Sequence, residues 1–206
     1  MTTKLYQFSC FYLNLIALNF LWLIGCLLGG ILFGIAPASV SLFSIYKEQD
    51  LSLFQSPLVL SKAFFQNYYR EFKQANLLSG MISLLGLFLW FDYQLVITQR
   101  DIFSLVIKYL LIVVIYFSVI ALLMFIPIYL HFDLPKVRYF LQTYIFVLTS
   151  PIELFLLTLM LGGMYVTVMY VPLWILPIYI SGQVVLISKI MDRRFLQLQI
   201  FTKNGQ

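Results

Sequence analysis

Five long apolar stretches constrain the fold of this chain more than any other feature. They run over residues 11–35, 77–97, 103–130, 139–161 and 164–187. Each is about as long as the roughly 20 residues that an α-helix needs to cross the hydrocarbon core of a bilayer. None alternates polar and apolar residues as membrane β-strands do. The pattern therefore predicts an all-α, polytopic transmembrane helical bundle of about five spans, in a single membrane domain over residues 1–206.

The composition agrees with a chain that lies mostly in lipid. Of its 206 residues, 62% are hydrophobic and 10% are charged, and its mean hydropathy is +0.96. A soluble domain is typically about half apolar and a quarter charged. The net charge of +5 is modest, and the basic residues flank apolar stretches instead of forming a stripe. We therefore expect the lipid bilayer, and no nucleic acid, as a partner.

The basic residues between the apolar stretches predict the orientation in the membrane. Lysine and arginine are enriched in cytoplasmic connections. If the five stretches all span, one side holds ten basic residues, and the other holds Lys4, Arg100 and the slightly embedded Lys108. This asymmetry predicts an outside N-terminus and a cytoplasmic tail over residues 188–206. The ten are Lys47, Lys62, Arg70, Lys73, Lys136, Arg138, Lys189, Arg193, Arg194 and Lys203.

The polar interval between the first two stretches predicts a cytoplasmic interfacial amphipathic helix over residues 57–75. Ser56 can cap its N-terminus, and Pro57 suits the first helical position. Its aromatic residues would enter the acyl boundary while the polar face meets lipid headgroups. This face is either a docking surface for a partner or a plain lipid anchor. Its candidate contact residues are Lys62, Gln66, Asn67, Arg70 and Lys73.

Four polar residues inside the predicted spans are the first candidates for function. Asp92, Lys108 and Glu153 fall in the predicted outer half of the bilayer, and Asn14 lies at a similar depth. An ionisable residue in a span is costly unless it is paired or protonated. The group predicts either a substrate or proton contact in an outward-facing cavity, or a structural polar cluster that fixes the register of the helices.

Glycines in the first stretch predict close helix packing. Gly25 with Gly29, and Gly30 with Gly34, have the small-xxx-small spacing that lets two backbones approach. Other chemistry is sparse. The single histidine, His131, has no set of accompanying ligands such as zinc requires, and no nucleophile motif is present. We therefore expect no metal, no cofactor and no enzymatic activity.

Short motifs along the N-terminal half resemble a known family. They are Leu18-Asn19-Phe20-Leu21-Trp22-Leu23, then Ala36-Pro37-Ala38-Ser39-Val40-Ser41-Leu42-Phe43, then Tyr68-Tyr69-Arg70-Glu71-Phe72-Lys73-Gln74-Ala75-Asn76-Leu77-Leu78, and finally Leu89-Trp90-Phe91-Asp92. Their order resembles the YesL-like family of bacterial membrane proteins, found mainly in Firmicutes and of unknown function. The resemblance covers residues 11–95. Members usually have Gly-Pro-Ala-Thr where this chain has Ala36-Pro37-Ala38-Ser39, a conservative departure.

The resemblance implies a multi-pass protein in the plasma membrane of a Gram-positive bacterium. It carries no assigned catalytic residues. The family's genes often neighbour sugar-uptake systems, so the resemblance suggests a non-enzymatic accessory or assembly partner of a carbohydrate uptake system. The alternative is a small transporter or channel with an outer-half polar cavity.

Overall fold

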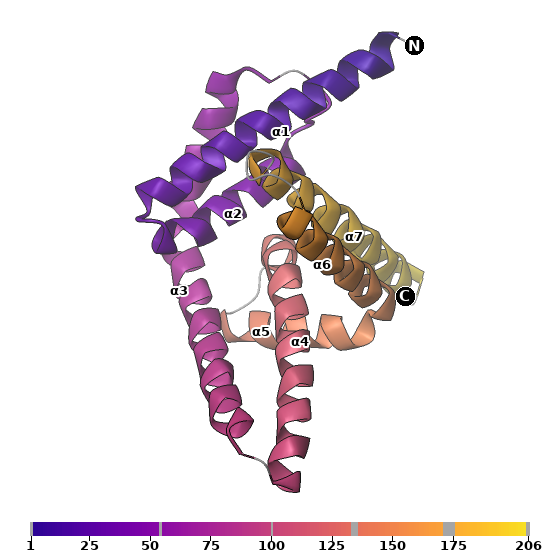
Figure 1. The fold of residues 1–206 in the computed structure, drawn as a ribbon. Helices are drawn as coiled ribbons and strands as arrows, with labels where there is room; N and C mark the ends of the chain where they lie inside the picture. Colours follow the sequence, from indigo (N-terminus) through magenta and orange to yellow (C-terminus); the bar gives the residue numbers. More distant parts are fainter. Residues whose placement is uncertain (1, 54, 100, 133–135, 171–175, 205–206) are drawn as a thin grey trace.

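A computed structural model describes the chain except residues 1, 54, 100, 133–135, 171–175 and 205–206. The described residues form α-helices joined by short connections, with no strand among them, which confirms the all-α class (Figure 1). In chain order the helices are α1 (Thr2–Leu28), α2 (Leu32–Glu48), α3 (Pro57–Ile97), α4 (Ile102–His131), α5 (Lys136–Thr149), α6 (Pro151–Tyr170) and α7 (Leu176–Asn204).

The first apolar stretch is two helices and not one. The sequence predicted a continuous helix over residues 11–35, but α1 ends at Leu28 and α2 begins at Leu32. Gly30 adopts a φ of +67°, and the N–H of Ile31 donates to the carbonyl of Cys26 at 2.8 Å. Glycine enters this left-handed conformation at little cost and commonly ends helices. The glycines thus place a turn where apolar length alone predicted a span.

The third helix is continuous where the sequence predicted a corner. Ser56 and Pro57 do begin α3, with the N–H of Val59 donating to Ser56 Oγ at 3.3 Å. The helix then runs 41 residues without a break near Asn76, so the division into an interfacial helix over 57–75 and a span over 77–97 is wrong. No proline or glycine lies between Pro57 and Gly80, and intact backbone hydrogen bonding favours a single helix there.

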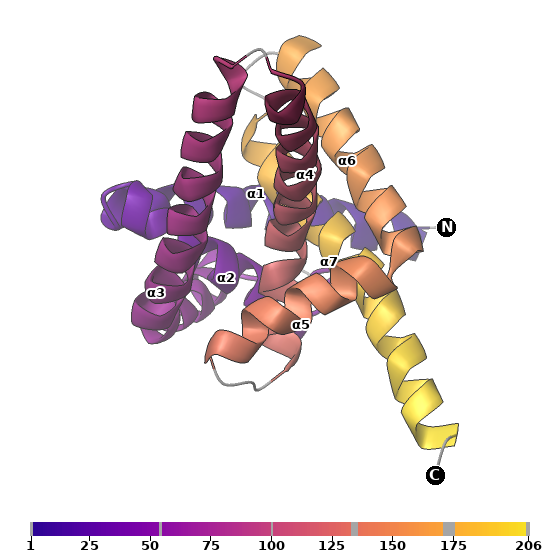
Figure 2. The same cartoon turned by 90° about the horizontal axis from the view of Figure 1, so that it is seen from below.

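Helices α3 and α4 form a long antiparallel hairpin (Figures 1 and 2). The bounds of α4 agree with the predicted stretch 103–130. At the hairpin tip, Ser104 Oγ and Gln99 Oε1 are hydrogen-bonded at 2.8 Å. Beyond Asn76 the exposed residues of α3 are mostly apolar, and in its most apolar 18 residues only 6% are buried.

The fourth predicted span, 139–161, is bent at Ser150. Helices α5 and α6 meet there at 94°, and the N–H of Leu154 donates to the carbonyl of Ser150 at 3.0 Å. Ser150 and Pro151 repeat the helix-start signal of Ser56 and Pro57. The Ser-Pro pair is present in the sequence, but it lies within a continuous apolar stretch, and the length of that stretch predicted a single span.

The last predicted span, 164–187, also differs from the structure. Helix α6 runs through Gly162 and Gly163, which separate the two predicted spans 139–161 and 164–187, to Tyr170. Residues 171–175, inside the last predicted span, lie outside the described residues. Helix α7 then continues to Asn204, so most of the predicted tail over 188–206 is helical.

Within the part of the chain that the structure describes, three helices are long and apolar enough to cross a membrane, where the sequence predicted five spans. They are Lys4–Leu28, α3 and α4, and the bent pair α5 and α6 would make a fourth. A buried hydrogen bond joins the first and the last helix of the bundle: Asn19 Nδ2 on α1 donates to Ser181 Oγ on α7 at 2.6 Å. The chain is thus an α-helical membrane bundle with fewer long spans than its apolar stretches suggested.

Candidate functional site

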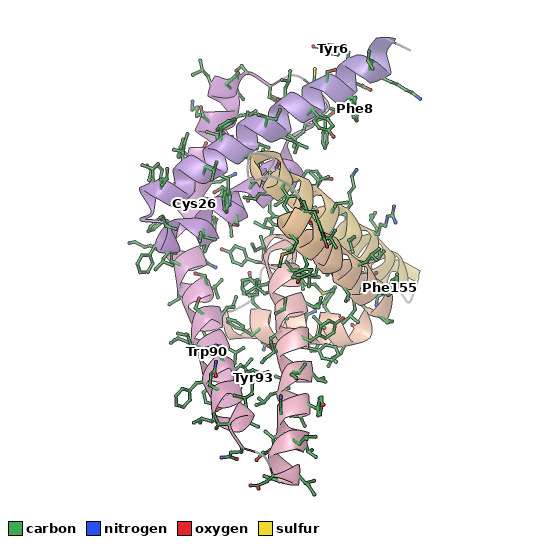
Figure 3. The ribbon with its side chains drawn as sticks, viewed as in Figure 1. Tyr6, Phe8, Cys26, Trp90, Tyr93 and Phe155 are labelled. Atoms are coloured by element: carbon green, nitrogen blue, oxygen red, sulfur yellow. The ribbon has the colours of Figure 1, made fainter. Side chains whose placement is uncertain are left out.

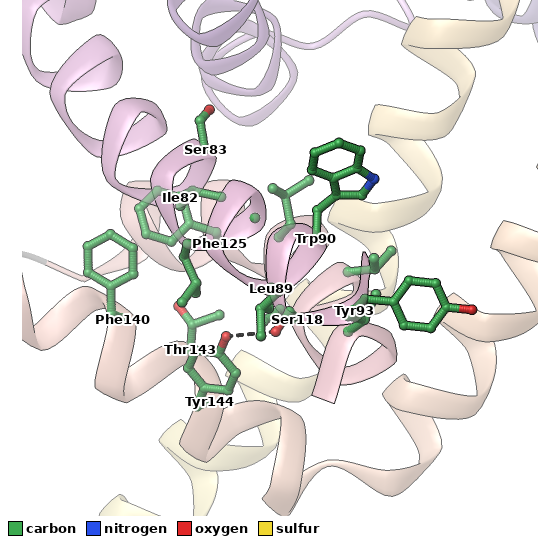
Figure 4. A pocket seen from close by; sticks show the side chains of 16 residues that line it. Ile82, Ser83, Leu89, Trp90, Tyr93, Ser118, Phe125, Phe140, Thr143 and Tyr144 are labelled. Atoms are coloured by element: carbon green, nitrogen blue, oxygen red, sulfur yellow. Dashed lines mark hydrogen bonds between the residues drawn. The ribbon is translucent and has the colours of Figure 1, made fainter. Parts of the chain in front are cut away.

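A cavity with a volume of about 400 Å³ lies between α3, α4 and α5 (Figure 4). Its inner wall contains Leu89, Phe125 and Thr143, which are buried. Its rim contains the more exposed side chains of Trp90 and Leu122. Figure 3 shows Trp90 and Tyr93 on the free part of α3. The cavity therefore opens onto the apolar outer surface of the α3–α4 hairpin.

Few polar atoms in the cavity remain available to a ligand. Ser118 Oγ and the Tyr144 hydroxyl are hydrogen-bonded at 3.1 Å (Figure 4). Ser118 Oγ also donates to the carbonyl of Val114, and Thr143 Oγ1 donates to the carbonyl of Tyr139. Because these hydroxyls already bond within the protein, the cavity favours an apolar occupant over a polar one.

One end of the cavity adjoins a polar network. The Tyr129 hydroxyl donates to Glu71 Oε2 at 2.6 Å, and Arg70 Nε pairs with Glu71 Oε1 at 3.0 Å. The Tyr129 ring lies over Phe125, which lines the cavity, with centroids 6.4 Å apart. Tyr129 also contacts Tyr139 at the start of α5. The first half of α3, the end of α4 and the start of α5 therefore meet at this end.

The structure does not gather the four predicted intramembrane polar residues into one cluster. Asp92 and Lys108 lie on opposite arms of the α3–α4 hairpin and form no ion pair, and neither lines the cavity. Asn14 holds the connection after α2, donating to the carbonyls of Leu51 and Leu53 at 3.0 and 2.7 Å. Its role in this structure is therefore to tie that loop to α1.

Glu153 is buried in the first turn of α6, close to the bend between α5 and α6. The positive end of the helix dipole is favourable for a carboxylate at this position. The sequence predicted one straight helix over residues 139–161 with Glu153 inside it. The bend at Ser150 divides that helix, so Glu153 lies near the start of α6. A local electrostatic role at the start of α6 accounts for its position.

The predicted contact face of residues 57–75 is only partly exposed. Lys62, Gln66, Arg70 and Lys73 are exposed, but Asn67 is 4% exposed and belongs to the interior. The aromatic residues Phe64 and Tyr68, expected in the acyl boundary, are buried within the same core cluster as residues of α1 and α2. This part of α3 is a packed element of the bundle with one polar face free.

Three of the four predicted packing glycines lie at close contacts. A Cβ on Gly25 would lie 3.1 Å from the Phe64 ring, and one on Gly29 would lie 2.3 Å from Gly34 Cα. A Cβ on Gly34 would lie 2.4 Å from the carbonyl oxygen of Cys26. Gly30 differs, because it has open space and supplies the turn. The glycine face therefore packs inside the α1–α2–α3 unit and is not free for another protein.

A second group of ionisable residues lies where α2, α4 and α7 converge, and the sequence did not indicate it. Lys47, His131 and Asp192 line a pocket of about 20 Å³, space for roughly one water molecule. Lys47 Nζ donates to the carbonyl of Leu130 at 2.7 Å, and the His131 ring stacks on Phe195. These contacts join helix ends, and the space is too small for a substrate.

The charges of this group perturb one another. Partial burial raises the pKa of Asp192, and the nearby Lys47 and His131 lower it again in part. Burial and the negative charge of Asp192 raise the pKa of Tyr46. Within the described residues, no three histidine, cysteine or acidic side chains lie together as metal ligands would.

Comparisons with known proteins place the chain among bacterial relatives without an assigned function. Residues 15–93 match the family model described as "Protein of unknown function, DUF624". The chain is 33% identical over 122 residues to the uncharacterized protein YteU of Bacillus subtilis (strain 168), covering 59% of this chain and 53% of that protein. It is 28% identical to the uncharacterized proteins YesV and YesL of the same organism, covering 64% and 66% of them.

The matched part of the chain thus spans between about half and two thirds of the length of these relatives. No solved structure matches the chain. The family match begins within α1 and ends within α3, so it includes the α1–α2 turn and most of α3. The chain is therefore similar over residues 15–93 to a family of unknown function, and it is similar to YesL itself, in agreement with the resemblance of its N-terminal motifs.

Proposed function

We propose that this protein is a non-enzymatic assembly partner of another membrane protein, in a carbohydrate uptake system of the plasma membrane. The carbohydrate assignment rests on the family resemblance. The orientation that accompanies this proposal has the N-terminus outside and the C-terminus in the cytoplasm, as the basic residues predict.

The observation that carries the proposal is the division of α3 into a fixed face and a free face. Phe64 and Tyr68 are fully buried, which anchors this part of the helix in the bundle. Lys62, Gln66 and Tyr69 are exposed on other sides of the same turns. A rigid helix that presents polar and aromatic side chains is a suitable docking surface, because little conformational entropy is lost on binding.

Site-directed crosslinking tests this proposal at two adjacent positions. In a background with Cys10 and Cys26 replaced by alanine, Gln66→Cys carries an exposed thiol, and Asn67→Cys carries a buried one as the matched control. A short thiol crosslinker in native membranes should join Gln66→Cys to one transport-system subunit, identified by mass spectrometry. Asn67→Cys should give no such product. Crosslinks to lipid alone, or the same products from both variants, would contradict the proposal.

The transporter alternative has no support from the site geometry. It requires a polar cavity around Asp92, Lys108 and Glu153, whereas the cavity of about 400 Å³ is lined by other and mostly apolar residues. We therefore do not propose transport by this chain.

A further inference from the structure

The cavity between α3, α4 and α5 lies between two helices that are able to span the membrane. Its rim is apolar and exposed: Trp90 is 59% exposed and Leu122 is 49% exposed. A cavity that opens on this surface faces hydrocarbon, because both flanking helices present apolar residues to lipid there. The opening of the cavity is therefore in contact with lipid acyl chains.

The dimensions of the cavity match one extended lipid chain. On α3 its lining runs from Ile82 to Tyr93, a helix rise of about 16 Å. A helix of this length and about 10 Å across would occupy roughly 1,200 Å³, three times the cavity's volume of about 400 Å³. The space suits a single acyl chain better than a partner helix.

Basic residues lie beyond the end of the cavity that adjoins Tyr129, outside its lining. Arg70 and Lys73 lie on the first half of α3, and Arg138 lies beside Tyr139 in the first turn of α5. The negative charge of Glu71 offsets part of this positive charge, and Glu71 is already paired with Arg70 and hydrogen-bonded to Tyr129. Lysine and arginine reach headgroups with long, flexible side chains, and each attracts anionic lipid. An anionic headgroup is therefore favoured at this end.

We propose that the cavity binds one anionic phospholipid, with the distal part of an acyl chain along α3 from Ile82 to Tyr93 and the headgroup beyond the Tyr129 end of the cavity, at the level of Arg70, Lys73 and Arg138. Lys73 precedes Ile82 by about 14 Å of helix rise, a distance that the glycerol and the first part of the acyl chain would span. This proposal does not depend on the assembly function. An acyl chain would fill the apolar space beside Leu89 and Phe125. The phosphate would meet the basic side chains that the positive-inside asymmetry places at the cytoplasmic leaflet.

Two glycines on α3 provide a matched pair of variants for the acyl chain. Gly86 lines the cavity and Gly80 does not, and a Cβ at either position has open space around it. Gly86→Leu should therefore fill the cavity, whereas Gly80→Leu adds the same side chain elsewhere on the helix. The purified full chain is exchanged into detergent with equal amounts of phosphatidylglycerol and phosphatidylcholine, and bound lipid is counted by native mass spectrometry.

The wild type and Gly80→Leu should each retain one phosphatidylglycerol, and Gly86→Leu should lose it. Thermal unfolding in detergent verifies that each variant is folded. Retention of the same lipid by folded Gly86→Leu would place that lipid outside the cavity and overturn the proposal. Absence of retained lipid from the wild type would also overturn it and would leave a partner protein as the occupant.

A second pair of variants tests the headgroup. Lys73→Gln with Arg138→Gln should lower the preference for phosphatidylglycerol over phosphatidylcholine by about 25-fold, since each basic side chain near the headgroups contributes about a fivefold preference. Lys4→Gln with Lys108→Gln removes the same charge from other parts of the chain and should leave the preference unchanged. An equal loss in both pairs would show a general charge effect and contradict the proposed headgroup site.

Discussion

At the scale of single residues, the glycines and the buried amides are the most informative positions. The sequence predicted close packing at Gly25, Gly29, Gly30 and Gly34, but it could not separate the three that make close contacts from the one that turns the chain. Asn14 was predicted to join a charged cluster, and it binds backbone carbonyls of a loop instead. The spacing of residues along a helix shows which of them share one side of it. Which element packs against that side depends on how the rest of the chain folds.

Substitution at Gly34 should destabilise the bundle strongly. In Gly34→Ala the new Cβ would lie 2.4 Å from the Cys26 carbonyl oxygen and 2.7 Å from that of Gly25, so α2 must move away from α1. We expect a loss of about 1–3 kcal/mol, typical of overpacking. Gly80→Ala, with open space, should be neutral or stabilising by up to about 1 kcal/mol. Thermal unfolding in detergent compares the two, and equal midpoints would contradict the tight α1–α2 contact.

The raised pKa of Asp192 predicts a pH-dependent stability effect. A carboxyl whose folded-state pKa lies above its ordinary value of 3.8 loses folded-state stability as the pH rises through the folded pKa. Asp192 is also exposed to solvent, which screens the effect. Asp192→Asn avoids the loss, so we expect a slightly higher unfolding temperature than that of the wild type at pH 7. The difference should shrink as the pH falls toward 4. A lower midpoint for Asp192→Asn at pH 7 would show that attraction to Lys47 and His131 outweighs the cost of burial.

At the scale of elements, helix starts were easier to predict than helix continuity. Ser56 with Pro57 marked the start of α3 correctly, and the bounds of α4 followed from apolar length. The corner expected near Asn76 is absent, because a change from an amphipathic to an apolar pattern does not by itself break backbone hydrogen bonds. The opposite error occurred at Ser150, where two helices with a similar apolar character meet at 94°.

A distance measurement tests the continuity of α3. Spin labels at Lys62→Cys and Leu84→Cys, both at exposed positions, should lie about 33 Å apart along a straight helix. Cys10 and Cys26 are replaced by alanine so that only the two sites are labelled. A corner near Asn76 would bring the labels markedly closer, and a main distance below about 25 Å would contradict the straight helix.

At the scale of the whole molecule, the number of long spans affects the predicted topology. The five predicted spans put the two termini on opposite sides of the membrane. Three spans, the number of long apolar helices among the described residues, would do the same, whereas a fourth span from the bent pair would put both termini on one side. The basic residues at 62–73 and 189–194 still indicate a cytoplasmic location for the start of α3 and for α7. The termini therefore provide a direct test of which arrangement the membrane contains.

We expect the C-terminus to lie in the cytoplasm. An epitope tag after Gln206 should be inaccessible to antibody in intact protoplasts and accessible after permeabilisation, because the basic residues of α7 favour the cytoplasmic side. A tag before Met1 should be accessible in intact protoplasts. Labelling of both tags without permeabilisation would contradict a cytoplasmic C-terminus, and labelling of neither would place both ends inside.

The sequence alone determined that this chain is an α-helical membrane protein with a resemblance to the YesL-like family, because apolar length and local motifs are properties of consecutive residues. Only the tertiary structure decided that the first stretch folds back at Gly30, that Phe64 and Tyr68 are core residues, and that an apolar cavity lies beside Leu89. Lipid and protein interiors are both apolar, so hydropathy cannot distinguish a residue that faces one from a residue that faces the other. That distinction arises only when helices from distant parts of the chain pack together.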